Sequence, residues 1–164
     1  IELHGNLGRV LCLQCGTRYE RAAVQRRIRR LNPDFVQESF ELTPDGDAVI
    51  PEEAIEGFRV PPCVVCGGVL KPDVVFFGEN VPKERVERAM RVVDEGEALL
   101  VVGSSLAVRS GLRFAEAAAR AEKPLAIIND GPTRADDLAT LKLEGRLGVT
   151  LSELAKELAV DAGG

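Results

Sequence analysis

The sequence predicts an α/β fold in which a small cysteine-containing module precedes an open parallel sheet. Three observations lead to this prediction. All four cysteines of the 164-residue chain stand in two Cys-x-x-Cys pairs, the second of which ends at residue 66. After these pairs, short apolar runs alternate with stretches of helical periodicity. Loops of Gly, Ser, Asn and Asp follow two of the apolar runs, as they do at the carboxyl ends of parallel strands.

The two cysteine pairs have the spacing of a structural zinc site. Each pair lets two sulfurs face one ion, and the glycine after it permits a tight turn. Because four thiolates leave no open coordination position, we expect a structural rather than a catalytic Zn²⁺. Four unrelated buried cysteines, or two disulfides, are the alternative, but they do not explain two glycine-closed pairs. The predicted ligands are Cys12, Cys15, Cys63 and Cys66.

Composition narrows the class of protein. A hydrophobic content of 45% with 29% charged residues is typical of a globular chain with a core. The net charge of −5 makes general binding to nucleic acid or to an anionic membrane unfavourable, and no apolar run is long enough for a membrane span. No stretch resembles a signal peptide, and metal-holding thiols suit a reducing compartment. Because the chain begins with Ile1 in a structured segment, we expect it to be part of a longer protein.

The first part of the chain is expected to fold around the metal. Residues 18–30 predict a helix, because Val24, Ile28 and Leu31 recur at helical spacing. This stretch carries six arginines, which we interpret as a solvated face in preference to a site for an anion or a partner. Residues 37–50 predict a small β excursion around an Asp-Gly turn. The 47 residues between the cysteine pairs must then form a subdomain that the metal closes.

The second part of the chain is expected to alternate strands and helices. The apolar runs predict strands, two of them continuous enough to be covered on both faces of a sheet. Residues 98–102 and 124–128 are the predicted strands, and residues 74–77 predict a buried strand or an extended loop. Helical spacing predicts helices over residues 81–93 and 110–121, and another from Thr150 onwards. Ser110 is the expected cap of the second helix, and Thr150 with Glu153 forms an expected capping box for the third.

Two loops after the predicted strands are candidate ligand sites. Ligands of open parallel sheets bind at the carboxyl ends of the strands. Backbone amides and hydroxyls there suit phosphate, and Asn or Asp side chains suit ribose hydroxyls. Each loop by itself is a common way to end a strand, so an ordinary structural turn is the alternative. The loop residues are Gly103, Ser104 and Ser105 after one strand, and Asn129, Asp130 and Gly131 after the next.

Taken together, the motifs resemble the sirtuin family of NAD-dependent protein deacylases, most closely the branch of mitochondrial-type sirtuins and their bacterial relatives. The matching segments are Glu2-Leu3-His4-Gly5, the two cysteine pairs, and residues 71–79, 103–108 and 127–129. The fold that this resemblance implies is α/β: the second half of a Rossmann-like parallel-sheet domain plus a small four-cysteine zinc module. The implied organisation is a histidine segment at 1–11, a zinc module at 12–70 and an NAD-binding half at 71–164.

The resemblance also implies a role for each matching residue. His4 corresponds to the catalytic base, in a reaction that moves an acyl group from lysine to ADP-ribose and releases nicotinamide. The implied contacts to the co-substrate NAD⁺ are Gly103, Ser104, Ser105, Asn129, Asp130, Gly131 and Leu147. An acylated-lysine peptide is implied to add a strand beside Val75, Phe77, Gly78, Glu79, Leu106 and Val108.

The sequence departs from the family over the family's first half. The first Rossmann strand, a Gly-Ala-Gly-x-Ser loop and an Asn-x-Asp pair just before the histidine have no counterpart here. We therefore expect residues 1–164 alone to leave an open sheet edge, to associate or be marginally stable, and to be inactive. The acyl group cannot be read from the chain. A sirtuin-type ADP-ribosyltransferase and a non-catalytic zinc-held interaction module are the alternatives. The implied compartment is the cytoplasm for a bacterial protein and the mitochondrial matrix for a eukaryotic one.

Overall fold

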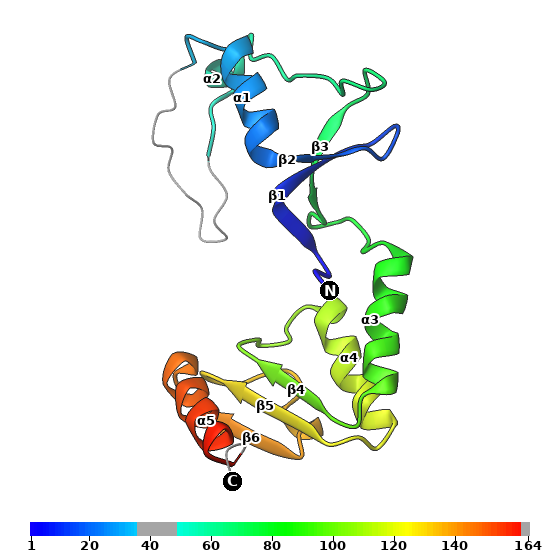
Figure 1. Cartoon of the computed structure of the whole chain (residues 1–164), viewed down its shortest axis with the longest axis vertical. Coiled ribbons are helices and arrows are strands. Elements are labelled where there is room, and N and C mark those ends of the chain that lie inside the picture. The colour runs from blue at the N-terminus through cyan, green and yellow to red at the C-terminus, as the bar shows by residue number, and fades with distance from the viewer. Residues whose placement is uncertain (36–48, 162–164) are drawn as a thin grey trace. The chain divides into compact units, whose positions relative to one another are not determined.

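The structure is a computed structural model that describes residues 1–35 and 49–161 (Figure 1). It divides into two compact units, and each is described by itself. We call Glu2–Glu79 the cysteine unit and Asn80–Gly164, which also takes in Ile1, the sheet unit. The β excursion expected at residues 37–50 lies almost entirely outside the described residues.

The cysteine unit contains a three-stranded antiparallel sheet in the order β2-β1-β3. The strands are β1 (Gly5–Cys12), β2 (Arg18–Glu20) and β3 (Leu70–Val74). The central strand β1 pairs with β3 from Gly5 opposite Val74 to Cys12 opposite Leu70, with a register shift between Asn6 and Val10. This pairing brings the first residues of the chain against a segment about 70 residues away in sequence.

The strand predicted at residues 74–77 lies earlier in the chain. It occupies Leu70–Val74 and includes Pro72, which an edge strand such as β3 tolerates. Residues 76–79 form a turn instead, in which the Glu79 N–H donates to the Phe76 carbonyl at 3.0 Å. Gly78 has a φ of +87°, a conformation that glycine adopts without strain. The apolar run therefore continues past the strand into an exposed turn.

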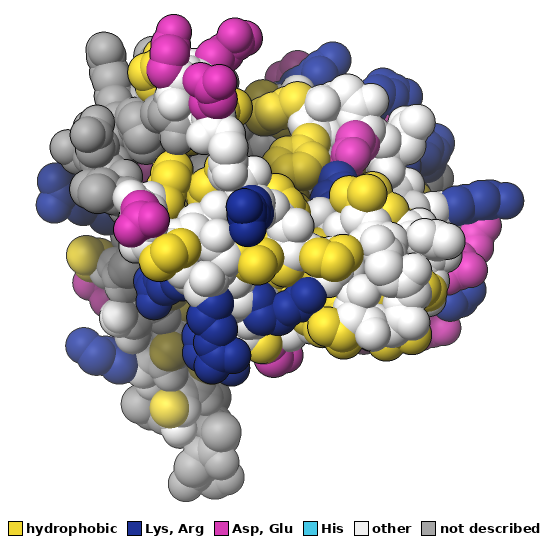
Figure 2. Space-filling view, turned by 90° about the horizontal axis from the view of Figure 1, so that it is seen from above, with side chains coloured by type: hydrophobic (Ala, Val, Ile, Leu, Met, Phe, Trp, Pro, Cys, Tyr) yellow, Lys and Arg dark blue, Asp and Glu magenta, His cyan; other side chains and the backbone are white. Residues whose placement is uncertain are grey.

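The arginine-rich helix α1 spans Arg21–Leu31, followed at a distance by the short helix α2 (Glu52–Ile55). Helix α1 begins later than expected because the three residues before it, Arg18–Glu20, pair with β1 as strand β2. Four of the six arginines are exposed and form no ion pair within the described residues, as expected for a solvated face. They are Arg21, Arg26, Arg29 and Arg30. On the face shown in Figure 2, basic and hydrophobic side chains are exposed next to each other.

The sheet unit contains a three-stranded parallel sheet in the order β4-β5-β6. The strands are β4 (Leu99–Val102), β5 (Leu125–Asn129) and β6 (Leu141–Glu144). The first two confirm the predicted strands. Strand β6 was not predicted, because Leu-Lys-Leu-Glu is short and contains no continuous apolar run. A short 3₁₀ helix, η1 (Asp136–Leu138), connects β5 to β6.

Three helices complete the sheet unit: α3 (Lys83–Glu95), α4 (Arg109–Arg120) and α5 (Leu147–Asp161). Two predicted caps were wrong. Helix α4 begins at Arg109, so Ser110 lies inside it, and α5 begins at Leu147, so Thr150 lies in its first turn and donates to the Arg146 carbonyl at 3.2 Å. No helix in the described ranges has the length and apolar content that crossing a bilayer requires.

The core of the sheet unit lies between α4 and one face of the sheet. Leu125 and Ile127 of β5 are fully buried there, against Leu112 and Ala115 of α4. The helix buries Leu112, Ala115 and Ala118. Helix α4 is visible beside β4 in Figure 1.

The opposite face of the sheet is open along β4 in the described residues, whereas Ile128 of β5 on the same face is buried. Leu100 and Val102 of β4 are 52% and 38% exposed, so β4 is not covered on both faces as its sequence predicted. Successive strand residues point to opposite faces, which explains why Leu99 and Val101 are half-buried while their neighbours are not. The expectation of uncovered apolar residues at an open sheet edge is thus confirmed, whereas association and marginal stability stay predictions.

Candidate active site and metal centre

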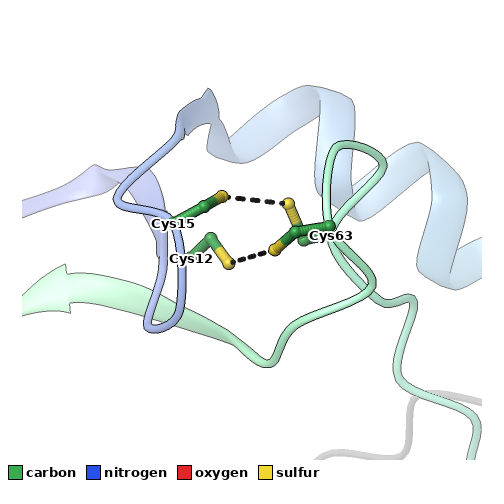
Figure 3. A group of neighbouring side chains, drawn as sticks. Cys12, Cys15 and Cys63 are labelled. Carbon is green, nitrogen blue, oxygen red and sulfur yellow. Dashed lines mark hydrogen bonds between the residues drawn. The ribbon is translucent and has the colours of Figure 1, made fainter.

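The four cysteine sulfurs converge on one point, as Figure 3 shows for the facing pairs. All four lie within 4.8 Å of one another. The Sγ atoms of Cys12 and Cys66 are 3.6 Å apart, and those of Cys15 and Cys63 are 3.7 Å apart. A tetrahedral zinc ion with Zn–S bonds of about 2.3 Å requires sulfurs about 3.8 Å apart, whereas a disulfide requires about 2.05 Å. The geometry therefore fits a tetrahedral metal site and excludes two disulfides.

Backbone hydrogen bonds shape the two cysteine turns in the same way. The Gly16 N–H donates to the Cys12 carbonyl at 3.0 Å, and the Gly67 N–H donates to the Cys63 carbonyl at 2.9 Å. Both glycines have positive φ, at +71° and +77°, as the turn chemistry predicted. A side chain at Gly68 would be crowded, because its Cβ would lie 2.8 Å from the Gln14 Cβ and 3.0 Å from the Cys12 sulfur. The local sequence thus determines how each pair of sulfurs is aimed.

Two hydroxyl groups that the sequence did not single out contact the sulfurs. The Tyr19 hydroxyl lies 3.0 Å from the buried Cys63 sulfur, and the Thr17 hydroxyl lies 3.1 Å from the exposed Cys15 sulfur. The bond from Tyr19 lowers the pKa of Cys63 to about 6, and that from Thr17 lowers the pKa of Cys15. A hydroxyl that donates to a thiolate favours the deprotonated form, which is the form that binds metal.

Replacing Tyr19 with Phe should weaken zinc binding. The substitution keeps the ring and removes only the hydroxyl that orients the Cys63 sulfur. Loss of an outer contact of this kind costs about tenfold to a hundredfold in metal affinity. Competition with a chromogenic chelator measures it, with Ser152→Ala, which removes a hydroxyl on α5, as the control. Equal zinc affinity in Tyr19→Phe and the wild type would show that the hydroxyl does not act on the metal.

His4 is held by its own backbone against the end of β3. The His4 carbonyl accepts the Val75 N–H at 2.9 Å, and the next residue, Gly5, pairs with Val74. A side chain at Gly5 is excluded, because its Cβ would lie 1.9 Å from the Asp73 carbonyl oxygen, and the φ of Gly5 is +88°. The His4 side chain is exposed. The structure thus joins the candidate base to the candidate peptide segment, which starts at Val75.

Charged groups also hold the residues around His4 against β3. Asp73 on β3 is buried, and its carboxylate lies 3.5 Å from the Arg9 Nε and 4.0 Å from the Arg18 Nε. Arg9 also pairs with Glu2, two residues before His4, and Glu2 accepts a hydrogen bond from the Asn6 amide. The Asn6 and Arg9 hydrogen bonds lower the pKa of Glu2. These contacts tie the residues on both sides of His4 to the sheet.

The candidate peptide segment ends in the turn of residues 76–79. Phe77 at its tip is 95% exposed, and Gly78 follows it with positive φ. The Glu79 carboxylate does not point away from the turn; it accepts the Phe76 N–H at 3.0 Å and a Lys71 N–H at 2.8 Å. Val75 and Glu79 therefore have bonding partners within the chain, whereas Phe77 is presented to solvent.

In the sheet unit, the candidate NAD residues meet at the carboxyl ends of the strands. Gly103 follows β4, and its N–H donates to the Ile128 carbonyl of β5 at 2.9 Å. Leu147, at the start of α5, packs so closely on Gly103 that a Cβ there would lie 2.6 Å from its Cδ1. Asn129, the last residue of β5, donates from its side chain to the Gly131 carbonyl at 3.1 Å. The parallel register therefore unites three separate sequence segments at one edge.

The residues after Gly103 divide between this edge and the core. The Ser104 hydroxyl accepts the Leu106 N–H at 3.2 Å, and the Ser105 carbonyl accepts the Arg134 N–H at 2.9 Å. The side chain of Leu106, which has a φ of +52°, is only 7% exposed and belongs to the core. Val108 is exposed. Of these two candidate peptide contacts, Val108 alone offers its side chain to a partner.

The sequence reasoning missed Thr17, Tyr19 and Lys71. Each makes a side-chain contact to a candidate site residue, at 3.1, 3.0 and 2.8 Å respectively. Thr17 is only two residues from Cys15, whereas Tyr19 contacts a cysteine 44 residues away and Lys71 a glutamate 8 residues away, and no spacing rule indicates these contacts. Tyr19 is the only tyrosine in the chain, but composition does not tell which residue its side chain contacts.

Three comparisons connect this geometry to known proteins. The model of the Sir2 family matches residues 1–110. The chain is 49% identical over 163 residues to NAD-dependent protein deacetylase 1 of Streptomyces coelicolor, covering 99% of this chain and 54% of that protein. It is 52% identical over 150 residues to human NAD-dependent protein lipoamidase sirtuin-4, mitochondrial, covering 92% of this chain and 48% of that protein. The chain thus spans about half the length of the curated relatives it matches.

Solved structures agree with the sequence comparisons. A structure described as Sir2-p53 peptide-NAD⁺ superimposes with a TM-score of 0.71 at 27% identity, over 98% of this chain and 55% of that one. A structure described as Sir2Tm bound to a propionylated peptide superimposes with a TM-score of 0.68 at 28% identity, over 99% of this chain and 56% of that one. The expected α/β fold with its four-cysteine module is therefore confirmed.

Proposed function

Because the chain belongs to the Sir2 family, we propose that the protein is an NAD-dependent protein lysine deacylase. The acyl group of a lysine side chain would pass to ADP-ribose, with release of nicotinamide. The observation that carries the proposal is the backbone bond between His4 and Val75, which joins a candidate base to a candidate peptide segment. The relatives named as NAD-dependent deacetylases and as a lipoamidase support the reaction class.

In the proposed mechanism, His4 acts as a general base. The amide oxygen of the acyl-lysine attacks the ribose carbon that carries nicotinamide, and the carbon–nitrogen bond to nicotinamide breaks. His4 then accepts a proton from a hydroxyl of that ribose, whose oxygen attacks the acyl carbon. The bond from the acyl carbon to the lysine nitrogen breaks, lysine leaves as the free amine, and a water molecule adds to the acyl carbon to give acyl-ADP-ribose. Histidine suits this step because its ordinary pKa lies close to neutral pH. The exposure of the His4 side chain leaves it accessible to a bound substrate.

Each remaining site is given a role consistent with its chemistry. We assign the edge formed by Gly103, Asn129 and Leu147 to the adenosine side of NAD⁺, since ligands of parallel sheets bind at this edge. We assign one zinc ion to the four cysteines, where it would hold the cysteine unit together without entering the reaction. Reduced thiols of this kind suit a reducing compartment, such as a bacterial cytoplasm or a mitochondrial matrix.

Peptide-dependent release of nicotinamide tests the proposed function. The full-length protein is incubated with NAD⁺ and a set of peptides that carry acetyl-lysine, propionyl-lysine or lipoyl-lysine, and both products are followed by mass spectrometry. We expect nicotinamide and acyl-ADP-ribose to form in equal amounts with at least one peptide. An unacylated peptide is the control. ADP-ribose attached to protein, without acyl-ADP-ribose, would instead favour a transferase, and no product with any peptide would refute the proposal.

A further inference from the structure

We propose that Lys71 and Glu79 are positioning residues that hold residues 74–79 in the shape that receives the acylated peptide. The inference rests on the proposed deacylase function and assigns to Glu79 a role different from direct contact with substrate. Neither residue is required to touch the reacting atoms. Their action would be to keep the backbone of the turn in one conformation before the peptide arrives.

Lys71, which lies on β3, contacts residues 74–79 through its ammonium group. Its ammonium group donates to the Val74 carbonyl at 2.6 Å and to the Glu79 carboxylate at 2.8 Å. The same nitrogen lies 4.6 Å from the centre of the Phe76 ring, within the range of a cation–π contact. The side chain of Lys71 is only 21% exposed. One lysine thus contacts the beginning, the middle and the end of the segment.

Glu79, the last residue of this segment, bonds back to Phe76 and to Lys71. One carboxylate oxygen, Oε2, accepts both the Lys71 N–H and the Phe76 N–H, the latter at 3.0 Å. The Glu79 N–H donates back to the Phe76 carbonyl, also at 3.0 Å. The hydrogen bonds from Lys71 and from the Phe76 amide lower the pKa of Glu79. The carboxylate is therefore charged at neutral pH, and hydrogen bonds to a charged group are stronger than neutral ones.

These bonds leave the backbone groups at the tip of the turn available to pair with a peptide. Within the described part of the chain, the backbone N–H and C=O groups of Phe77 and Gly78 form no hydrogen bond. An extended peptide that pairs with a strand-like edge needs such unpaired groups, held in line. The same segment is anchored to the His4 carbonyl through the Val75 N–H. A shift of the turn would therefore move the bound peptide relative to His4.

The expected effect is on peptide recognition and not on global stability. A partly exposed ion pair contributes little to the stability of a whole domain. Misplacement of a substrate by about 1 Å, in contrast, can cost about a hundredfold in rate. We therefore expect Lys71→Met and Glu79→Ala, in the full-length protein, to raise the KM for the acylated peptide by roughly tenfold. The KM for NAD⁺ and the zinc content should stay at the wild-type values.

Two further variants and one direct measurement sharpen the test. Lys71→Arg keeps the positive charge and should recover part of the peptide affinity. Lys83→Met removes an ion pair to Glu87 on α3, 3.5 Å long and well exposed, and serves as the matched control with unchanged KM values. Hydrogen exchange of the Phe76 amide, which bonds to Glu79, should become faster in Glu79→Ala and stay slow in Lys83→Met.

Each outcome decides the inference. A peptide KM that stays within twofold of wild type in both Lys71→Met and Glu79→Ala overturns it, even when the Phe76 amide exchanges faster, because the pair would then be structural only. Equal increases in the KM for NAD⁺ and for peptide, or loss of zinc, also overturn it. If the wild-type protein releases no nicotinamide with any acylated peptide, the proposed function itself fails. Active wild type with unaffected variants refutes only the role of Lys71 and Glu79.

Discussion

Replacing His4 with Tyr in the full-length protein will abolish NAD-dependent deacylation while one zinc per chain stays bound. A positioned general base contributes about a hundredfold to ten-thousandfold to the rate, and tyrosine cannot accept a proton near neutral pH. His4 is exposed, and its backbone carbonyl, which accepts the Val75 N–H, is retained in the variant. The substitution should therefore remove the base and leave the fold of the cysteine unit intact.

Nicotinamide release with an acylated peptide measures this effect, and elemental analysis measures the zinc. Leu7→Ala is a suitable control, because Leu7 is a 66% exposed residue on the same strand, β1. The control should keep near wild-type turnover. Turnover in His4→Tyr within tenfold of wild type would contradict the assignment of His4 as the base. Loss of zinc in His4→Tyr would instead show that the residue supports the fold.

Removing zinc, by a strong chelator or by Cys63→Ser, will unfold the cysteine unit. Structural zinc sites of this kind contribute about 10–16 kcal/mol of apparent binding energy, which is folding energy when the site does not exist in the unfolded chain. The unit has little else to hold it, since its buried hydrophobic residues in the described ranges are few. They are Val10, Cys12, Val24 and Cys63, with Pro61 also buried. Two of these five residues, Cys12 and Cys63, are themselves candidate metal ligands.

Hydrogen exchange followed by mass spectrometry can resolve this effect by unit. After chelation, we expect the amides of β1 and β3 to lose protection, whereas those of β5 keep theirs. The sheet unit is the internal control, because Leu125 and Ile127 form its core without any cysteine. Added zinc should restore the protection of β1 and β3. Unchanged protection in β1 after metal removal would mean that backbone pairing alone stabilises the cysteine unit.

Several features of the site could be predicted from the sequence because they depend on local chemistry. A Cys-x-x-Cys-Gly segment has few ways to turn, so the convergence of Cys12 with Cys15, and of Cys63 with Cys66, follows from the spacing alone. The continuous apolar runs identified β4 and β5 as strands, although in the described residues only β5 is covered on both faces. The glycine and asparagine loops after these strands were found for the same reason.

Other features depend on pairing between distant segments. Strand β3 covers Leu70–Val74 rather than 74–77 because its register is determined by β1, where Gly5 lies opposite Val74. Helix α5 starts at Leu147 rather than Thr150 because Leu147 packs on Gly103, at the end of β4. In both cases a local signal was present, but contacts with another strand determined the boundary.

The sequence alone identified the residues to which we assign the chemistry: the two cysteine pairs, His4 in its Glu-Leu-His-Gly segment, and the loops that end the parallel strands. Local spacing and side-chain chemistry were sufficient for these, since each needs only neighbouring residues. The tertiary structure decided what supports them, namely the hydroxyl of Tyr19 on Cys63 and the contacts of Lys71 with Glu79. Tyr19 and Cys63 are 44 residues apart and Lys71 and Glu79 are 8 residues apart, so both contacts depend on how separate segments fold together, which no local pattern encodes.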